Sequence, residues 1–120
     1  MSPDFNVFYC RHRTGDMIDS YKPEPMPLER ILDLAPSILE GVGDFLGLVD
    51  RQEGVIQFMH LARGEDVSRP IRVDVPDLAR QGAYVRQITP DEMLGVLRHL
   101  PERLSASAVP GLRFESSLGR

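Results

Sequence analysis

Apolar residues alternate with polar ones over several short segments of the chain, and this alternation predicts β-strands. In residues 5–13, Phe5 and Val7 share one face while Phe8 and Cys10 share the other. Because both faces carry apolar side chains, we expect an interior strand. Four further strands are predicted, over residues 45–49, 55–62, 70–76 and 83–88. The first two of these four form the clearest hairpin, because the connecting residues are polar and end in glycine.

Helical spacing of apolar residues predicts two helices. The first begins after Pro27, and because Pro36 interrupts its apolar face we expect a kink or two short helices that end near residues 41–43. The second covers residues 90–100, where the sequence Thr-Pro-Asp-Glu at 89–92 combines a capping box with proline at the first helical position. Its apolar face then follows without interruption.

The order of these elements predicts an α+β fold: a mostly antiparallel sheet of about five strands, with two helices packed on one face and the other face open to binding. A length of 120 residues suits a single domain. Three alternating prolines in residues 14–27 predict an extended connection rather than a helix or a central strand. Residues 102–120 are expected to form a partly ordered tail.

The net charge of −4 and the isoelectric point near 5.3 argue against a broad phosphate-neutralising surface, and therefore against a nucleic-acid partner. A basic partner fits this charge better. The apolar runs are too short for a membrane span, and the N-terminus lacks a secretory pattern. The single cysteine, Cys10, excludes an internal disulfide and fits a reducing compartment, so we expect a cytoplasmic protein.

Cys10 and His12 share a strand face, which raises the question of a nucleophile and its base. Residues two apart on a strand have backbones roughly 7 Å apart, so we favour a structural cysteine beside a surface histidine. The three histidines lack the spacing of a zinc site. We therefore expect neither a catalytic residue nor a metal or other cofactor.

Two alternatives stay open. One is a small-molecule or nucleotide-binding enzyme or sensor that uses a sheet face bearing arginine and histidine side chains. Its candidate ligand-binding residues are Arg11, His12, His60, Arg72 and Arg86. The other is a homodimeric structural or accessory protein that pairs through its open sheet face or an edge strand.

The segment FLGLVDRQEGVIQFMH, followed by IRVDVP, GAYVRQ and TPDEMLGVLRHLP, resembles small bacterial immunity proteins of polymorphic-toxin and type VI secretion systems. The resemblance is one of pattern and covers about residues 44–101. It implies an acidic α+β domain without catalysis that binds and neutralises a cognate, basic protein toxin. The resemblance includes no diagnostic motif, so no residue role is carried over from the family.

Under this hypothesis, the partner-binding residues are acidic side chains in loops, together with one tyrosine. The proline-rich connection supplies Asp16, Asp19 and Tyr21, and the predicted strand-connecting loops supply Asp50, Glu53, Glu65 and Asp66. Acidic loops of this kind favour electrostatically steered recognition of a basic protein.

Overall fold

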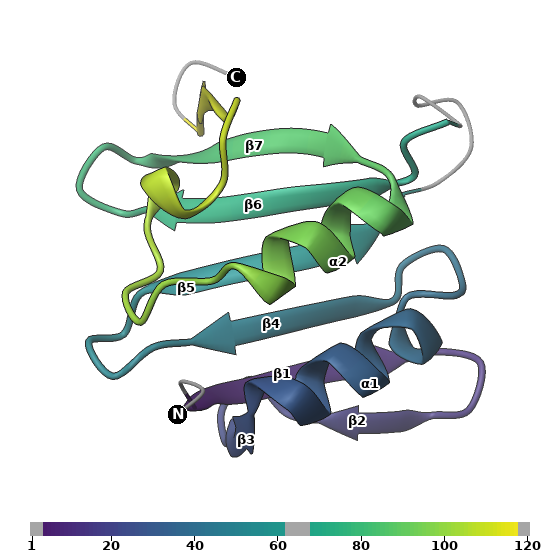
Figure 1. The fold of residues 1–120 in the computed structure, drawn as a ribbon. Helices are drawn as coiled ribbons and strands as arrows, with labels where there is room; N and C mark the ends of the chain where they lie inside the picture. The colour runs from purple at the N-terminus through teal and green to yellow at the C-terminus, as the bar shows by residue number, and fades with distance from the viewer. Residues whose placement is uncertain (1–3, 62–67, 118–120) are drawn as a thin grey trace.

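A computed structural model describes residues 4–61 and 68–117 of the chain. Eight antiparallel strands form one sheet in the order β2-β1-β4-β5-β6-β7-β8, with β3 also paired to β1 (Figure 1). The strands are β1 (Asp4–Arg11), β2 (Asp16–Ile18), β3 (Glu24–Pro27), β4 (Phe45–Val49), β5 (Val55–His60), β6 (Ile71–Asp77), β7 (Gly82–Ile88) and β8 (Arg113–Ser116). The helices are α1 (Leu28–Ile38), α2 (Pro90–Arg98) and the 3₁₀ turn η1 (Ala106–Ala108).

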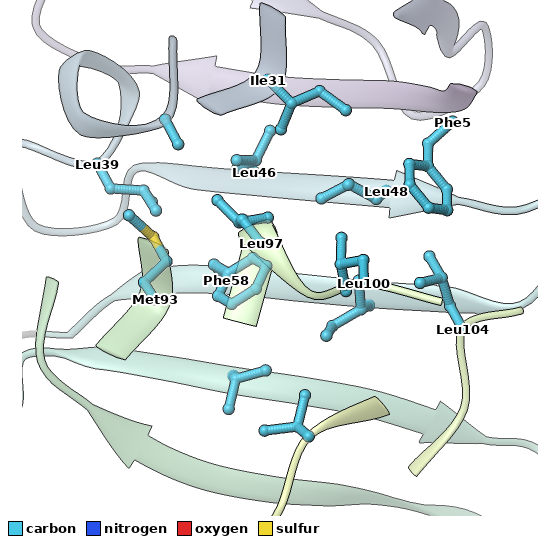
Figure 2. Close-up of a cluster of buried hydrophobic side chains, with 14 of the residues drawn as sticks. Phe5, Ile31, Leu39, Leu46, Leu48, Phe58, Met93, Leu97, Leu100 and Leu104 are labelled. Atoms are coloured by element: carbon cyan, nitrogen blue, oxygen red, sulfur yellow. The ribbon is translucent and has the colours of Figure 1, made fainter. Parts of the chain in front are cut away.

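Both α-helices lie on the same face of this sheet, as the sequence predicts (Figure 1). Alternate residues of the central strands point toward them, including Leu46, Leu48 and Phe58, each at most 1% exposed. Figure 2 shows these side chains against Ile31 of α1 and Leu97 of α2. Burial of this one continuous apolar layer fixes which face of every strand points inward.

The prediction of about five strands is wrong, because three short strands lie in segments expected to be a connection and a tail. β2 and β3 form inside residues 14–27 and both pair with β1, while β8 pairs with β7. Pro25 and Pro27 fit β3 because it is an edge strand, whose outer side needs no backbone donors. Gly15 turns the chain from β1 into β2 with a positive φ of 73°.

The prediction for the first helix is also corrected. α1 is a single helix that contains Pro36 and ends at Ile38. Pro36 lies in the last turn and on the exposed side, so it removes one hydrogen bond near the end of the helix without dividing it. Neither α1 nor α2, the two α-helices of the described residues, is long enough to span a membrane.

The capping box of α2 is confirmed. The backbone N–H of Glu92 donates to Thr89 Oγ1 at 3.1 Å, and the N–H of Thr89 donates to Glu92 Oε1 at 3.0 Å. α2 ends at Arg98, two residues before the predicted end. The predicted hairpin is also present, with β4 and β5 paired from Phe45 opposite Met59 to Val49 opposite Val55.

Candidate functional site

Asp16, Asp19 and Tyr21 lie together at the sheet edge formed by β2 and β3. Asp16 is held from the sheet: Tyr9 Oη donates to Asp16 Oδ2 at 3.0 Å, and Arg11 Nη1 lies 3.9 Å from the same oxygen. Burial, and then the hydrogen bond to Asp16, raises the pKa of Tyr9. The carboxylate of Asp16 nevertheless stays exposed.

Tyr21 is 91% exposed, the largest exposed fraction among the big apolar side chains of the described residues. Its backbone is held in place, because Tyr21 N donates to Asp19 Oδ1 at 2.9 Å and Lys22 N donates to Asp19 O at 3.0 Å. This is a turn closed by an aspartate side chain. A ring that projects into solvent from an ordered backbone is typical of a contact residue in a protein interface.

The segment that forms this edge and the helix that follows it is acidic. Residues 14–40, which form β2, β3 and α1, contain six acidic residues and two basic ones, and this difference equals the net charge of −4 of the whole chain. All six acidic side chains are exposed: Asp16, Asp19, Glu24, Glu29, Asp33 and Glu40. We call these residues, with Tyr21, the acidic edge.

Asp50 has a different environment from the one predicted for it. Its side chain is 6% exposed and accepts hydrogen bonds from the backbone N–H groups of Gln52 (2.7 Å), Gly54 (2.8 Å) and Leu104 (2.6 Å). Burial acts to raise the pKa of Asp50, but these three donors outweigh it and leave the pKa below its usual value. Asp50 therefore ties the β4–β5 hairpin to the C-terminal segment.

The remaining predicted contact residues lie away from the acidic edge or outside the described residues. Glu53 is exposed in the β4–β5 hairpin, which adjoins the start of β1, whereas Asp16 pairs with Arg11 at the end of β1. Glu65 and Asp66 lie outside the described residues. The structure thus brings together three of the seven.

The five residues of the alternative ligand face do not converge. Arg72 pairs across strands with Gln87, so Arg72 and Arg86 point to opposite faces of the sheet. Arg86 donates to Glu92 Oε2 at 3.1 Å, while Arg72 donates to Glu115 Oε1 at 3.1 Å. Both guanidinium groups are therefore occupied by carboxylates.

The two histidines of that set both contact the segment of Gly43 and Asp44, but their side chains make separate contacts. His60 lies at the end of β5, where its Nδ1 is 3.2 Å from the carbonyl oxygen of Leu61. His12 follows β1 on the face opposite the helices and contacts Cys10 and Gly43. Arg72 lines two hollows: one of about 280 Å³, which Arg86 and Arg113 also line, and one of about 620 Å³ beside Gly82 and Glu115. Neither of these two hollows is lined by His12 or His60.

The sheet face opposite the two helices carries an apolar row across four strands. Cross-strand register places Met17, Cys10, Phe45 and Met59 side by side. Beside this row the ring of Phe8 covers Gly47, where a Cβ atom would lie 2.0 Å from Phe8 Cζ. Within the described residues no α-helix covers this face, and pairing of two copies through it stays a prediction.

Cys10 and His12 are closer than the sequence indicates. Cys10 Sγ lies 4.0 Å from both His12 Nδ1 and His12 Nε2. The His12 backbone N–H donates to Asp44 Oδ1 at 2.8 Å, and Asp44 is only 2% exposed. The sequence does not indicate the bond between His12 and this buried carboxylate, because the two residues are 32 positions apart in the chain. No group of three or more His, Cys, Asp and Glu side chains suited to a metal occurs in residues 4–61 and 68–117.

Fold and surface together define an antiparallel α+β protein with a projecting acidic edge. Comparison with known proteins found no matching family, no matching curated protein and no matching solved structure.

Proposed function

We propose that this protein is a non-catalytic binding protein that recognises a basic protein partner through its acidic edge. One observation carries the proposal: the segment that holds the whole net charge of the chain also presents Tyr21, 91% exposed, from an ordered turn. Acidic side chains attract a basic partner before contact, and a tyrosine supplies apolar area once the surfaces meet.

The fixed backbone around Tyr21 strengthens this proposal. Binding costs conformational entropy when loops and side chains become ordered, and an ordered loop lowers that cost. The two hydrogen bonds to Asp19 hold the turn, so that the tyrosine ring is displayed in the free protein. Asp16, held by Tyr9, is displayed in the same way.

The edge strands favour recognition by side chains over the addition of a partner strand. β2 is three residues long, and β3 contains Pro25 and Pro27, which have no backbone N–H to offer. Short strands and prolines are features with which proteins block pairing at a sheet edge. A partner is thus expected to contact the carboxylates and the tyrosine ring.

The form of this function that we propose first is an immunity-type inhibitor. The resemblance to immunity proteins supports it, and so does the acidic edge, because such an inhibitor masks a cationic toxin surface by charge and shape. A protein of this kind needs no catalytic residue, and the buried role of Asp50 removes it from the contact set.

The experiment is co-expression with the product of the adjacent reading frame, followed by measurement of the dissociation constant at low and high salt. We expect Tyr21→Ala to weaken binding by about 30-fold or more, as for an interface hot spot. The double variant Asp16→Arg/Asp19→Arg should slow association and abolish most of the salt dependence.

The matched control reverses two exposed acids outside the acidic edge, Glu53→Arg/Glu102→Arg. It should bind as the unmodified protein does. Weaker binding by this control with no change in the acidic-edge variants would show that the partner uses the hairpin end instead. A partner that is not basic, or affinity that does not respond to salt, would contradict the electrostatic basis of the proposal.

A further inference from the structure

The strand β8 lies at the opposite end of the sheet from β2, and among the described strands it pairs only with β7. Its sequence, Arg-Phe-Glu-Ser at 113–116, places a positive and a negative side chain two residues apart. We propose that β8 pairs antiparallel with β8 of a second copy of this chain, so that two copies form a symmetric dimer with one continuous sheet. This surface is separate from the acidic edge, and the proposal does not depend on the function proposed above.

The backbone of Phe114 directs its hydrogen-bonding groups away from β7. Ser117 N donates to Gln81 O at 2.9 Å, and this bond fixes the phase of the ladder between β7 and β8. Bonded and non-bonded pairs alternate along an antiparallel ladder, so the backbone groups of Arg113 and Glu115 face β7 and those of Phe114 face outward. Phe114 of one copy and Phe114 of a second copy can therefore exchange two backbone hydrogen bonds.

The charges of β8 select this register. With the twofold axis at Phe114, Arg113 of each copy lies opposite Glu115 of the other. These are non-bonded positions of the new ladder, where opposite Cα atoms are about 4.5 Å apart and side chains are closest. An axis at Arg113 or at Glu115 would instead place two like charges opposite each other. The strand is therefore complementary to itself in one register.

The side chain of Phe114 holds β8 in place within each copy. Its ring meets the ring of Tyr84 edge to face, with centroids 5.3 Å apart, and the guanidinium carbon of Arg80 lies 4.5 Å from its centroid. Gly82 leaves space for the same ring, since an added Cβ would lie 2.6 Å from Phe114 Cζ. An edge strand that is ordered before it pairs lowers the entropic cost of association.

The β8 edge lacks the features that block pairing at the other end of the sheet. β3 contains two prolines, whereas β8 contains none, so every residue of β8 has a backbone N–H. Charged side chains on an edge strand discourage pairing where like charges meet, but here they attract a second copy. Because β8 has only four residues, the interface is small, and we expect the weak, reversible association of a small interface.

The test is sedimentation equilibrium of the full chain at micromolar to millimolar concentrations, where the unmodified protein should show a monomer–dimer equilibrium. Arg113→Glu and Glu115→Arg should each weaken self-association by about 10-fold or more, because each variant places like charges opposite each other twice. An equal mixture of the two variants should associate as the unmodified protein does, because the mixed dimer has opposite charges in both pairs. The matched controls, Arg51→Glu and Glu53→Arg, change an exposed pair with the same spacing in the β4–β5 hairpin and should have no effect.

A second measurement covers the loss of β8 in a variant, since Glu115 also pairs with Arg72. In the unmodified protein, the NMR signal of the Phe114 amide should shift as the concentration rises, while the amide signals of β2 stay in place. A chain that stays monomeric throughout would overturn the proposal. A dimer that Arg113→Glu does not weaken, or a Phe114 signal that does not move, would overturn it as well, because the copies would then meet elsewhere.

Discussion

At the scale of single residues, Asp50 has a role that its position in a polar hairpin loop does not reveal. Aspartate in such a loop is typical of both a solvent-exposed contact and a turn residue. The third donor to its carboxylate, the backbone N–H of Leu104, lies 54 residues away in the sequence. A short-range pattern predicts the loop but not this long-range bond.

Asp50→Ala should lower the free energy of unfolding by about 3 kcal/mol or more. The change removes a charged acceptor and leaves three backbone donors without it, each loss costing on the order of 1–3 kcal/mol when the donor is buried. Urea unfolding followed by circular dichroism measures the effect.

Gln52→Ala is the control for this variant, because its exposed side chain lies in the same loop and only its backbone N–H bonds to Asp50. The control should change the unfolding free energy by less than about 0.5 kcal/mol. Equal effects of the two variants would contradict the structural role of Asp50 and restore it as a candidate contact.

The sequence predicts Tyr21 and Asp19 as contact residues, but it does not predict the strand pairing beside them. Tyr21 and Asp19 are conspicuous in the sequence, because an aromatic ring next to acidic residues in a proline-rich segment suits binding. The surroundings of Cys10 are different, since Met17 becomes a neighbour of Cys10 only through the pairing of β2 with β1. Residues 14–27 are predicted as a connection, so the sequence does not predict which of them lies opposite Cys10.

At the scale of elements, local signals explain which predictions are confirmed. α2 is predicted because its capping box and its apolar face lie within a dozen consecutive residues. β2, β3 and β8 are short and lie at sheet edges, and prolines in β3 oppose a strand prediction. Their pairing depends on β1 and β7 being in place, and tertiary contacts of this kind override local propensity.

The packing of β1 on β4 depends on a glycine and a ring. The Phe8 ring occupies the space above Gly47, so Gly47→Ala places a Cβ atom 2.0 Å from Cζ and 2.4 Å from each Cε atom of that ring. We expect a loss of roughly 1–3 kcal/mol in unfolding free energy, since the ring must move. The double variant with Phe8→Leu should lose at least about 1 kcal/mol less than the two single losses combined.

Gly95→Ala is the matched control for this pair. Its added Cβ meets no atom within 4 Å, and alanine is favoured over glycine inside a helix such as α2. The control should raise the unfolding free energy by about 0.5–1 kcal/mol. Additive losses in the Gly47 and Phe8 variants would show that the ring and the glycine do not contact each other in solution.

At the scale of the whole molecule, charge is distributed unevenly. Outside residues 14–40 the chain has twelve acidic and twelve basic residues, so the rest of the sequence is neutral as a unit. Several of these charges pair with one another, as Arg86 does with Glu92 and Arg72 with Glu115. Arg11 and Arg13 pair with Asp16 and Glu40 and offset part of the charge of the acidic edge. The remaining negative charge would orient the protein in the field of a basic partner.

Three carboxylates, the buried Asp44 and Asp50 and the half-buried Asp74, contribute to the variation of stability with pH. Burial acts to raise the pKa of Asp44, but backbone hydrogen bonds, first from His12 and then from Gly41, lower it below the ordinary value of 3.8; Asp50 behaves in the same way. In Asp74, by contrast, burial outweighs the nearby Arg72 and raises the pKa. The first two groups bind protons more readily in the unfolded chain, whereas Asp74 binds them more readily in the folded one.

The free energy of unfolding should therefore be highest above about pH 5 and should fall as the pH drops through 3.8 toward the lower folded pKa values of Asp44 and Asp50. Urea unfolding from pH 7 to pH 3 measures this decline.

Asp44→Asn should start from a lower unfolding free energy, and this free energy should decline less as the pH falls. Asp74→Asn removes the one group of the three that stabilises the fold as the pH falls. The unfolding free energy of this variant should therefore decline more steeply than that of the unmodified protein. A profile that is flat between pH 5 and pH 3, or the same slope in both variants, would mean that the hydrogen bonds to these carboxylates do not govern the acid stability of the fold.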